Sequence, residues 1–260
     1  MIYFNNIILN TNTFKYKTIM NLIDCFPFVL SLLSAGIIYM IECIKKRKNI
    51  SNYIIFYDLE TTGLNPYHSK IIEIAALLYS VEQKKVIDRF SSLVNPGIHI
   101  PEKITKITKI DDEMVNNAPN LDTVLKEFIN FSRLNEECNI YFVAHNGDSF
   151  DKLFLRQHLF NNQYQINANI NHLDTMRFAQ KLLPNVKRYS LNSLCLHYGI
   201  EQKNAHRADA DTTHMVNVYH KLCEELSSKY YSHLMKGEDE SEIENKLVHC
   251  PTIIQDYIYN

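Results

Sequence analysis

The stretch that most constrains this chain is the hydrophobic run Ile54–Tyr57, which ends in two carboxylates, Asp58 and Glu60, separated by one leucine. The run predicts a buried strand ending at Asp58, and side chains two residues apart on a strand leave the same face, about 6–7 Å apart. Two such carboxylates repel each other unless a cation lies between them. A Thr-Thr-Gly sequence at 61–63 predicts a sharp turn with exposed backbone N–H groups. The pattern therefore predicts a site for a hard divalent ion such as Mg²⁺ or Mn²⁺.

Length and charge limit the class of protein. The 260 residues leave room for one domain of about 150–200 residues plus extensions. The formal net charge is −2, which argues against a protein that binds long duplexes through a basic face. An enzyme that holds a few phosphates through metal ions needs no such face. Six scattered cysteines, without a C-x-x-C pair, predict reduced thiols and do not indicate zinc.

Residues 1–50 are expected to form an N-terminal extension with a membrane segment. Seventeen uncharged residues run from Cys25 to Ile41, and a basic cluster follows at 45–48. We predict a transmembrane helix over about residues 22–42, with the following domain on the cytoplasmic side by the positive-inside rule. The alternatives are a hydrophobic helix packed on the domain, in a cytoplasmic or nuclear protein, and a cleaved signal peptide, which the order of charges disfavours.

Residues 51–230 predict one α/β domain. Strands are expected over 70–80 and 84–94 as antiparallel neighbours, then over 139–144 and just before Asp174. A short helical stretch should open at 101–103, and longer helices are expected over 121–134, from 148 to 160, and over 175–183, 190–198 and 205–226. This order predicts a mixed sheet with helices on both faces. Residues 231–260 predict an acidic linker and a tail that docks weakly through Ile253, Ile254 and Tyr257.

A second acidic motif lies where a strand breaks at Gly147 and a helix begins. Asp148 or Ser149 is the expected helix cap, because its side chain would accept backbone N–H bonds. Asp151 falls in the first turn, where the helix dipole favours an anion. Taken alone, each of these acids is explained equally well as a carboxylate at a helix start.

A third motif places His206 and Asp211 five residues apart, with alanines between them. If the helix begins a residue or two after His206, Asp211 faces the sheet as a rigid ligand. His206 then lies on a flexible approach, which suits a base that must reach a water molecule. A single histidine at such a position is more often a surface residue.

Together, D-x-E followed by T-T-G, then H-N-G-x-x-F-D, then H-x-x-x-x-D closely resemble the DEDDh 3′–5′ exonuclease family. That family includes proofreading and three-prime repair exonucleases, and the segment 145–148 is particularly similar to the three-prime repair branch. The resemblance covers about residues 51–225. It implies an α/β, ribonuclease H-like mixed sheet flanked by helices, here with an N-terminal hydrophobic helix. The implied activity is release of nucleoside 5′-monophosphates from the 3′ end of DNA or RNA.

Carried onto the matching positions, the resemblance implies the site residues. Two Mg²⁺ or Mn²⁺ ions would be held by four carboxylates, Asp58, Glu60, Asp151 and Asp211. His206 would be the general base. Thr61, Leu64 and Asn146 would contact the substrate, with Leu64 wedged against the terminal base.

One departure from the family is Lys109, where relatives usually have glycine, and we expect it to alter the backbone of that loop. The lysines at 103, 106 and 109 have helical spacing, which favours a solvated face over phosphate contacts. The expected partners are DNA with a 3′ end, single-stranded DNA included, or RNA; a polymerase or other replication or repair protein; and a membrane through residues 22–42. The alternative is a non-catalytic nucleic-acid-binding module, or a membrane-anchored interaction module, on the same fold.

Overall fold

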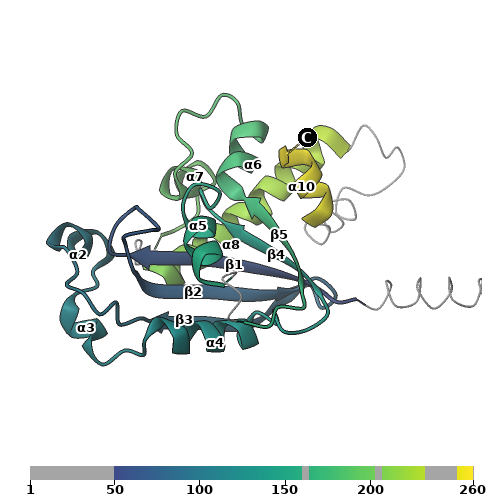
Figure 1. Cartoon of the computed structure of the whole chain (residues 1–260). Coiled ribbons are helices and arrows are strands. Elements are labelled where there is room, and N and C mark those ends of the chain that lie inside the picture. Colours follow the sequence, from purple (N-terminus) through teal and green to yellow (C-terminus); the bar gives the residue numbers. More distant parts are fainter. Residues whose placement is uncertain (1–49, 160–163, 203–206, 232–250, 260) are drawn as a thin grey trace, which may run out of the picture. The chain divides into compact units, whose positions relative to one another are not determined.

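The computed structural model of this chain describes residues 50–159, 164–202, 207–231 and 251–259, without the side chains of residues 230 and 231 (Figure 1). The transmembrane segment predicted at 22–42 and the predicted base His206 therefore lie outside the described residues. Within the described ranges, none of the helices combines the length and apolar character that crossing a bilayer requires.

One mixed sheet of five strands, in the order β3-β2-β1-β4-β5, forms the centre of the domain. The strands are β1 (Asn52–Thr61), β2 (Ile71–Ser80), β3 (Lys85–Leu93), β4 (Asn139–Ala144) and β5 (Asn169–Asp174). The first three pair antiparallel, whereas β4 and β5 run parallel to β1. The predicted mixed sheet is confirmed. The predicted end of β1 at Asp58 is wrong, because the backbone continues to pair with β2 through Thr61.

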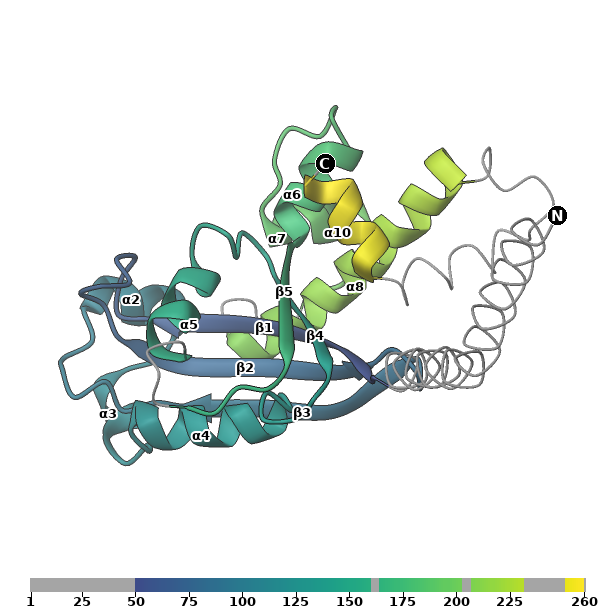
Figure 2. The ribbon, with the colours of Figure 1, turned by 45° about the vertical axis from the view of Figure 1, so that its right-hand side comes forward.

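Helices cover both faces of this sheet, as Figure 2 shows. One face packs against α4 (Leu121–Phe131) and α5 (Asp151–Leu159), and the other against α6 (Thr175–Leu182), α7 (Leu191–His197) and α8 (Ala208–Leu226). Two short helices, α2 (Glu102–Thr108) and α3 (Asp112–Asn116), lie between β3 and α4 in sequence, and a π-helical turn, η1 (Ser227–Tyr231), follows α8. The predicted two-sided arrangement of helices is therefore confirmed.

The C-terminal segment adds one more helix, α10 (Pro251–Tyr259), to the face that α6 covers. Ile254 is fully buried there. The ring of Tyr257 meets that of Phe178 edge-on at 5.9 Å, and the hydroxyls of Tyr141 and Thr252 lie 2.9 Å apart. The predicted docking of this tail is confirmed, and its apolar side chains join the main core.

Lys109 occupies the C-cap position of α2, where its φ is 62° and its backbone N–H donates to the carbonyl of Thr105 at 2.9 Å. This is the left-handed conformation that glycine adopts at little cost and other residues seldom adopt. The lysine thus holds a backbone geometry that suits glycine. Lys106 lies 3.7 Å from Glu102 on the exposed side of α2, as expected for a solvated face.

Candidate active site

Strand β1 delivers Asp58 and Glu60 to the face of the sheet that α8 covers. Ile54 and Phe56 pack in the same core cluster as Met215 of α8, while the alternate residues of β1 pack toward α4 and α5. Side chains alternate along a strand, so Asp58 and Glu60 continue the row that faces α8. The apolar part of this row fixes the strand against the helix, and its last two members carry the charge.

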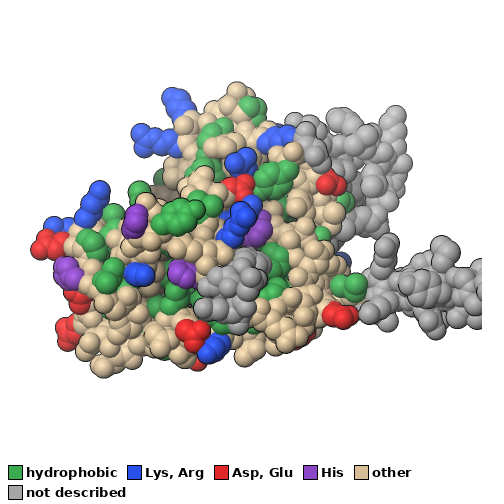
Figure 3. All heavy atoms as spheres, in the orientation of Figure 1, with side chains coloured by type: hydrophobic (Ala, Val, Ile, Leu, Met, Phe, Trp, Pro, Cys, Tyr) green, Lys and Arg blue, Asp and Glu red, His purple; other side chains and the backbone are tan. Residues whose placement is uncertain are grey.

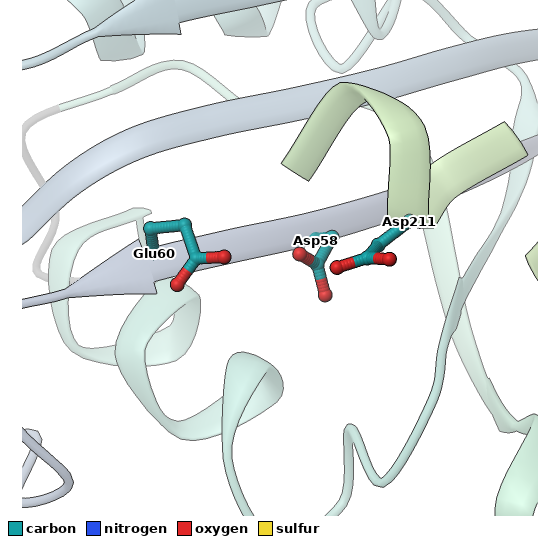
Figure 4. A group of neighbouring side chains, drawn as sticks. All are labelled: Asp58, Glu60 and Asp211. Atoms are coloured by element: carbon teal, nitrogen blue, oxygen red, sulfur yellow. The ribbon is translucent and has the colours of Figure 1, made fainter. Parts of the chain in front are cut away.

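Three carboxylates meet where this row approaches the start of α8. Oxygen atoms of Asp58, Glu60 and Asp211 all lie within 4.8 Å of one another. Figure 4 shows the carboxylates of Asp58 and Asp211 directed toward each other, with Glu60 farther along β1. Helix α8 begins at Ala208 rather than at residue 205, the start predicted from the sequence. This start meets the condition under which Asp211 was expected to face the sheet. Asp211 consequently falls in its first turn, close to the strand.

Asp151, the fourth predicted carboxylate, enters from the start of α5 and is only 2% exposed. Its Oδ1 accepts a hydrogen bond from the backbone N–H of Leu59 at 3.1 Å. Its charge is near enough to Asp58 to raise the pKa of that carboxyl group. The structure therefore places Asp151 beside the three clustered carboxylates. A hydrogen bond fastens it to β1, the strand that carries Asp58 and Glu60.

Burial is the first cause of the unusual electrostatics of this site. It raises the pKa of Asp58 well above its ordinary value, and the nearby charge of Asp151 adds to this effect. Burial and the charge of Glu73 raise the pKa of Glu60 to about 8. Burial also raises the pKa of Asp151 to about 7, although its backbone hydrogen bonds act in the opposite direction. Without a cation, these acids therefore hold protons at pH values where carboxyl groups are normally ionised.

The donor set fits a divalent cation. All three clustered side chains offer carboxylate oxygens, which hard ions such as Mg²⁺ and Mn²⁺ prefer. Mutual repulsion and burial oppose ionisation of these groups, and the positive charge of a bound cation would offset both effects. The geometry and the electrostatics thus agree with the metal site that the sequence predicted.

Two of the predicted substrate contacts lie where β1 ends: Thr61 is its last residue, and Leu64 lies in the turn that follows. Thr61 is buried, and its hydroxyl donates to the carbonyl of Gly63 at 2.6 Å. Leu64 is 83% exposed. The predicted exposure of the backbone N–H groups of this turn is wrong for Thr62, because its N–H donates to the carbonyl of Lys70 at 2.8 Å.

Asn146, the third predicted substrate contact, lies half-buried with a φ of 64° in the turn between β4 and α5. Its backbone N–H donates to Asp174 at 3.0 Å, as does the N–H of Asp148 at 3.1 Å. A Cβ on Gly147 would lie 2.5 Å from that of Ala144, so this turn requires glycine. Asp174 thus fixes the approach to α5.

Asp148 does not act as the predicted cap of α5. Its two carboxylate oxygens instead bind Lys152 at 3.1 Å, Arg177 at 2.9 Å and the hydroxyl of Tyr259 at 3.1 Å. These partners come from α5, α6 and α10, and a short-range sequence pattern reveals only the first. Asp148 therefore joins three helices beside the turn that carries Asn146.

Residues outside the predicted set also surround the carboxylates. Glu73 of β2, opposite Glu60 in the strand register, is 1% exposed and pairs with Arg207 at 2.9 Å. His214, 6% exposed, places its Nδ1 3.6 Å from Oδ1 of Asp211. One signal could have revealed Glu73: it is the only charged residue in a ten-residue buried strand, and a buried charge needs a partner.

The mixed sheet flanked by helices is a ribonuclease H-like fold, and three carboxylates cluster on it. The chain belongs to the exonuclease family, since the family model described as an exonuclease, RNase_T, matches residues 55–219. Membership in this family confirms the resemblance to exonucleases that the three sequence motifs indicated.

Two relatives illustrate the sequence similarity. The chain is 34% identical over 206 residues to the PolC-type DNA polymerase III of Oceanobacillus iheyensis, which covers 77% of this chain but only 14% of the relative. It is 34% identical over 191 residues to the DNA polymerase III subunit epsilon of Aquifex aeolicus, covering 73% of this chain and 90% of that subunit. The chain thus spans a small part of the length of the PolC-type relatives.

Solved structures of exonuclease I share the fold. One covers 69% of this chain and 42% of its own, with a TM-score of 0.57 and 18% identity. The Escherichia coli enzyme in complex with a dT13 oligonucleotide gives the same TM-score and identity, over 70% of this chain and 42% of its own. At such low identity the likeness establishes the fold alone.

Proposed function

We propose that this domain is a metal-dependent 3′–5′ exonuclease that removes nucleoside 5′-monophosphates from the 3′ end of DNA. The observation that carries the proposal is the convergence of Asp58, Glu60 and Asp211 in a member of the exonuclease family. Two comparisons favour DNA over RNA: one relative is named as a DNA polymerase III subunit, and exonuclease I of the same fold binds an oligodeoxynucleotide.

We assign two Mg²⁺ or Mn²⁺ ions to the site, held by four carboxylates, Asp58, Glu60, Asp151 and Asp211. Bound divalent ions supply activation of a water molecule and stabilisation of the departing 3′ oxygen. Strand β1, the first turn of α8 and the hydrogen bond from Leu59 to Asp151 position these carboxylates in the fold. We assign His206 the role of taking the proton from the attacking water.

We assign the terminal nucleotide to Thr61, Leu64 and Asn146. An exposed leucine on a turn fixed by hydrogen bonds offers an apolar surface for a base, and Leu64 is such a residue. On the face shown in Figure 3, Lys and Arg side chains are scattered among uncharged ones. A scattered charge suits an enzyme that holds a few terminal nucleotides better than a protein that binds long duplexes.

The biological setting belongs to the proposal as well. Because the similar bacterial proteins are named as DNA polymerase III components, we propose a replicative polymerase as the partner class. We also propose that residues 22–42 anchor the chain in a membrane, with the exonuclease domain on the cytoplasmic side. Alkaline extraction of membranes tests the anchor: the full chain should remain in the pellet and a chain lacking residues 1–50 should not.

A time course on 5′-labelled oligonucleotides tests the activity. The full chain should shorten single-stranded DNA from its 3′ end in Mg²⁺ or Mn²⁺, release nucleoside 5′-monophosphates, and stop in EDTA. Parallel reactions on duplex DNA and RNA determine the substrate. Asp58→Asn should abolish the reaction. Asp88→Asn, at an exposed carboxylate on the edge strand β3, is the matched control and should leave it unchanged. An inactive wild-type chain that still binds oligonucleotides would indicate the non-catalytic module instead.

A further inference from the structure

Glu73 is a buried carboxylate to which no role has been assigned above, yet both of its side-chain oxygens accept hydrogen bonds. Its Oε1 accepts from Nη2 of Arg207 at 2.9 Å. Its Oε2 accepts from Nε of Arg207 at 3.4 Å and from the backbone N–H of Ala208 at 3.2 Å. A planar guanidinium bound through two nitrogens fixes direction as well as distance. Glu73 therefore joins the middle of the sheet to the first residues of α8.

The turn that Glu73 holds is the one that carries Asp211. The backbone N–H of Asp211 donates to the carbonyl of Arg207 at 3.0 Å, which closes the first turn of α8. On the sheet side, Glu73 pairs in register with Glu60. A short chain of contacts thus links the carboxylate on α8 to those on β1, from Glu60 across the strands to Glu73, then to Arg207 and Asp211.

We propose that Glu73 and Arg207 act as a positioning pair, which sets the distance between Asp211 and the carboxylates of β1 and thereby sets the affinity of the site for divalent metal ions. Neither residue is among the proposed metal ligands. Groups that orient metal ligands commonly change metal affinity about 10–100-fold when they are removed. The inference deepens the proposed function, on which it rests for the identity of the metal site.

Because Glu73 and Arg207 carry opposite charges, substituting each of them distinguishes an effect on the position of Asp211 from a simple change in the charge of the site. If charge alone mattered, Glu73→Gln would make the site less negative and weaken metal binding, whereas Arg207→Gln would make it more negative and strengthen binding. If the pair positions Asp211, both substitutions weaken binding. Because both remove the same contact, the double variant should then bind metal no worse than the weaker of the two single variants.

The test measures Mn²⁺ binding to the metal-free full chain without nucleic acid, by calorimetry or by the electron paramagnetic resonance of free Mn²⁺. We expect each single variant to lose about 10-fold or more in Mn²⁺ affinity, with a non-additive double variant. Arg207→Lys, which keeps the charge but loses the planar fork, should also weaken binding. It tests the proposal even if Glu73→Gln does not fold, because Arg207 is 38% exposed.

A matched control is Glu136→Gln, which breaks a similar pair with Arg133 (3.0 Å) just before β4 and should leave Mn²⁺ affinity unchanged. Shifts of opposite sign in the two single variants would overturn the proposal, as would a lower melting temperature with unchanged Mn²⁺ affinity. The readout is independent of the proposed hydrolysis. If wild-type protein binds Mn²⁺, the variants bind it weakly and no DNA is degraded, the proposed function fails and the positioning pair stands.

Discussion

The carboxylate of Asp151 accepts a hydrogen bond from the backbone N–H of Leu59, although the two residues are 92 positions apart in sequence. Leu59 lies between Asp58 and Glu60, so this bond fastens the start of α5 to the part of β1 that carries both acids. Asp151 therefore has two separable properties: it accepts a hydrogen bond that holds the fold, and it carries a charge close to Asp58.

Substitutions at Asp151 should separate these properties. In Asp151→Asn the amide oxygen still accepts the bond from Leu59, so we expect the free energy of unfolding without metal to change by less than about 1 kcal/mol. The charge is lost, and we expect the rate of DNA hydrolysis to fall by about 100-fold or more. Asp151→Ala leaves the N–H of Leu59 unpaired, which costs about 1–3 kcal/mol of stability. Urea unfolding and steady-state kinetics measure the two effects, and a fully active Asp151→Asn would remove Asp151 from the metal site.

The stability of the metal-free protein should fall as the pH rises. Burial and the charge of Glu73 raise the pKa of Glu60 from 4.5 to about 8, so the folded state binds this proton more tightly than the unfolded state does. The resulting stabilisation is complete below the unfolded pKa and is lost as the pH rises through the folded pKa, between about pH 5 and pH 8. Glu60→Gln removes this titrating group.

Melting temperatures in EDTA across that range check the sign. Relative to Glu60→Gln, the wild type should lose stability toward pH 8, and added Mn²⁺ should reverse the loss because bound metal replaces the proton. If the wild type instead becomes more stable relative to Glu60→Gln as the pH rises, Glu60 is ionised in the metal-free folded state.

Leu64 offers a test of the substrate contact. Its side chain is 83% exposed, so Leu64→Ala should change the free energy of unfolding by no more than about 0.5 kcal/mol. If the leucine packs on the terminal base, the loss of that apolar contact should lower kcat/KM by roughly 5–30-fold. The matched control is Leu196→Ala, at a leucine of α7 that is 74% exposed. Equal kinetics for the two variants would place the base elsewhere.

Local sequence patterns were sufficient for part of the site. The spacing of Asp58 and Glu60 follows from the period of a strand, and the position of Asp211 follows from a helix that begins just after His206. These are short-range relations, within one strand or one turn of helix. Lys109, which was expected to alter the backbone of its loop, instead keeps a left-handed C-cap φ of 62°, the conformation that glycine favours.

The rest of the site depends on how distant segments pack. The pair of Glu73 and Arg207 joins residues 134 positions apart, and it requires both the register of β1 with β2 and the placement of α8. Asp148, one of the two alternatives predicted for the cap of α5, binds Arg177 and Tyr259 instead, from helices that lie far along the chain. Helix α3 was not predicted, because its five residues are too few to show a helical period.

The last prediction concerns α10, which lies beyond the 51–230 segment predicted as the exonuclease domain. Ile254 is fully buried in the core cluster that includes residues of α6 and α8, so Ile254→Ala removes packed apolar volume from that core. We expect a loss of about 2–5 kcal/mol in the free energy of unfolding, measured by urea denaturation of the whole chain. Asp256→Ala, at an exposed position of the same helix, is the control and should change stability by no more than about 0.5 kcal/mol. If both variants are as stable as wild type, α10 contributes nothing to the core. If Ile254→Ala alone is destabilised, the folding unit includes the C-terminal helix.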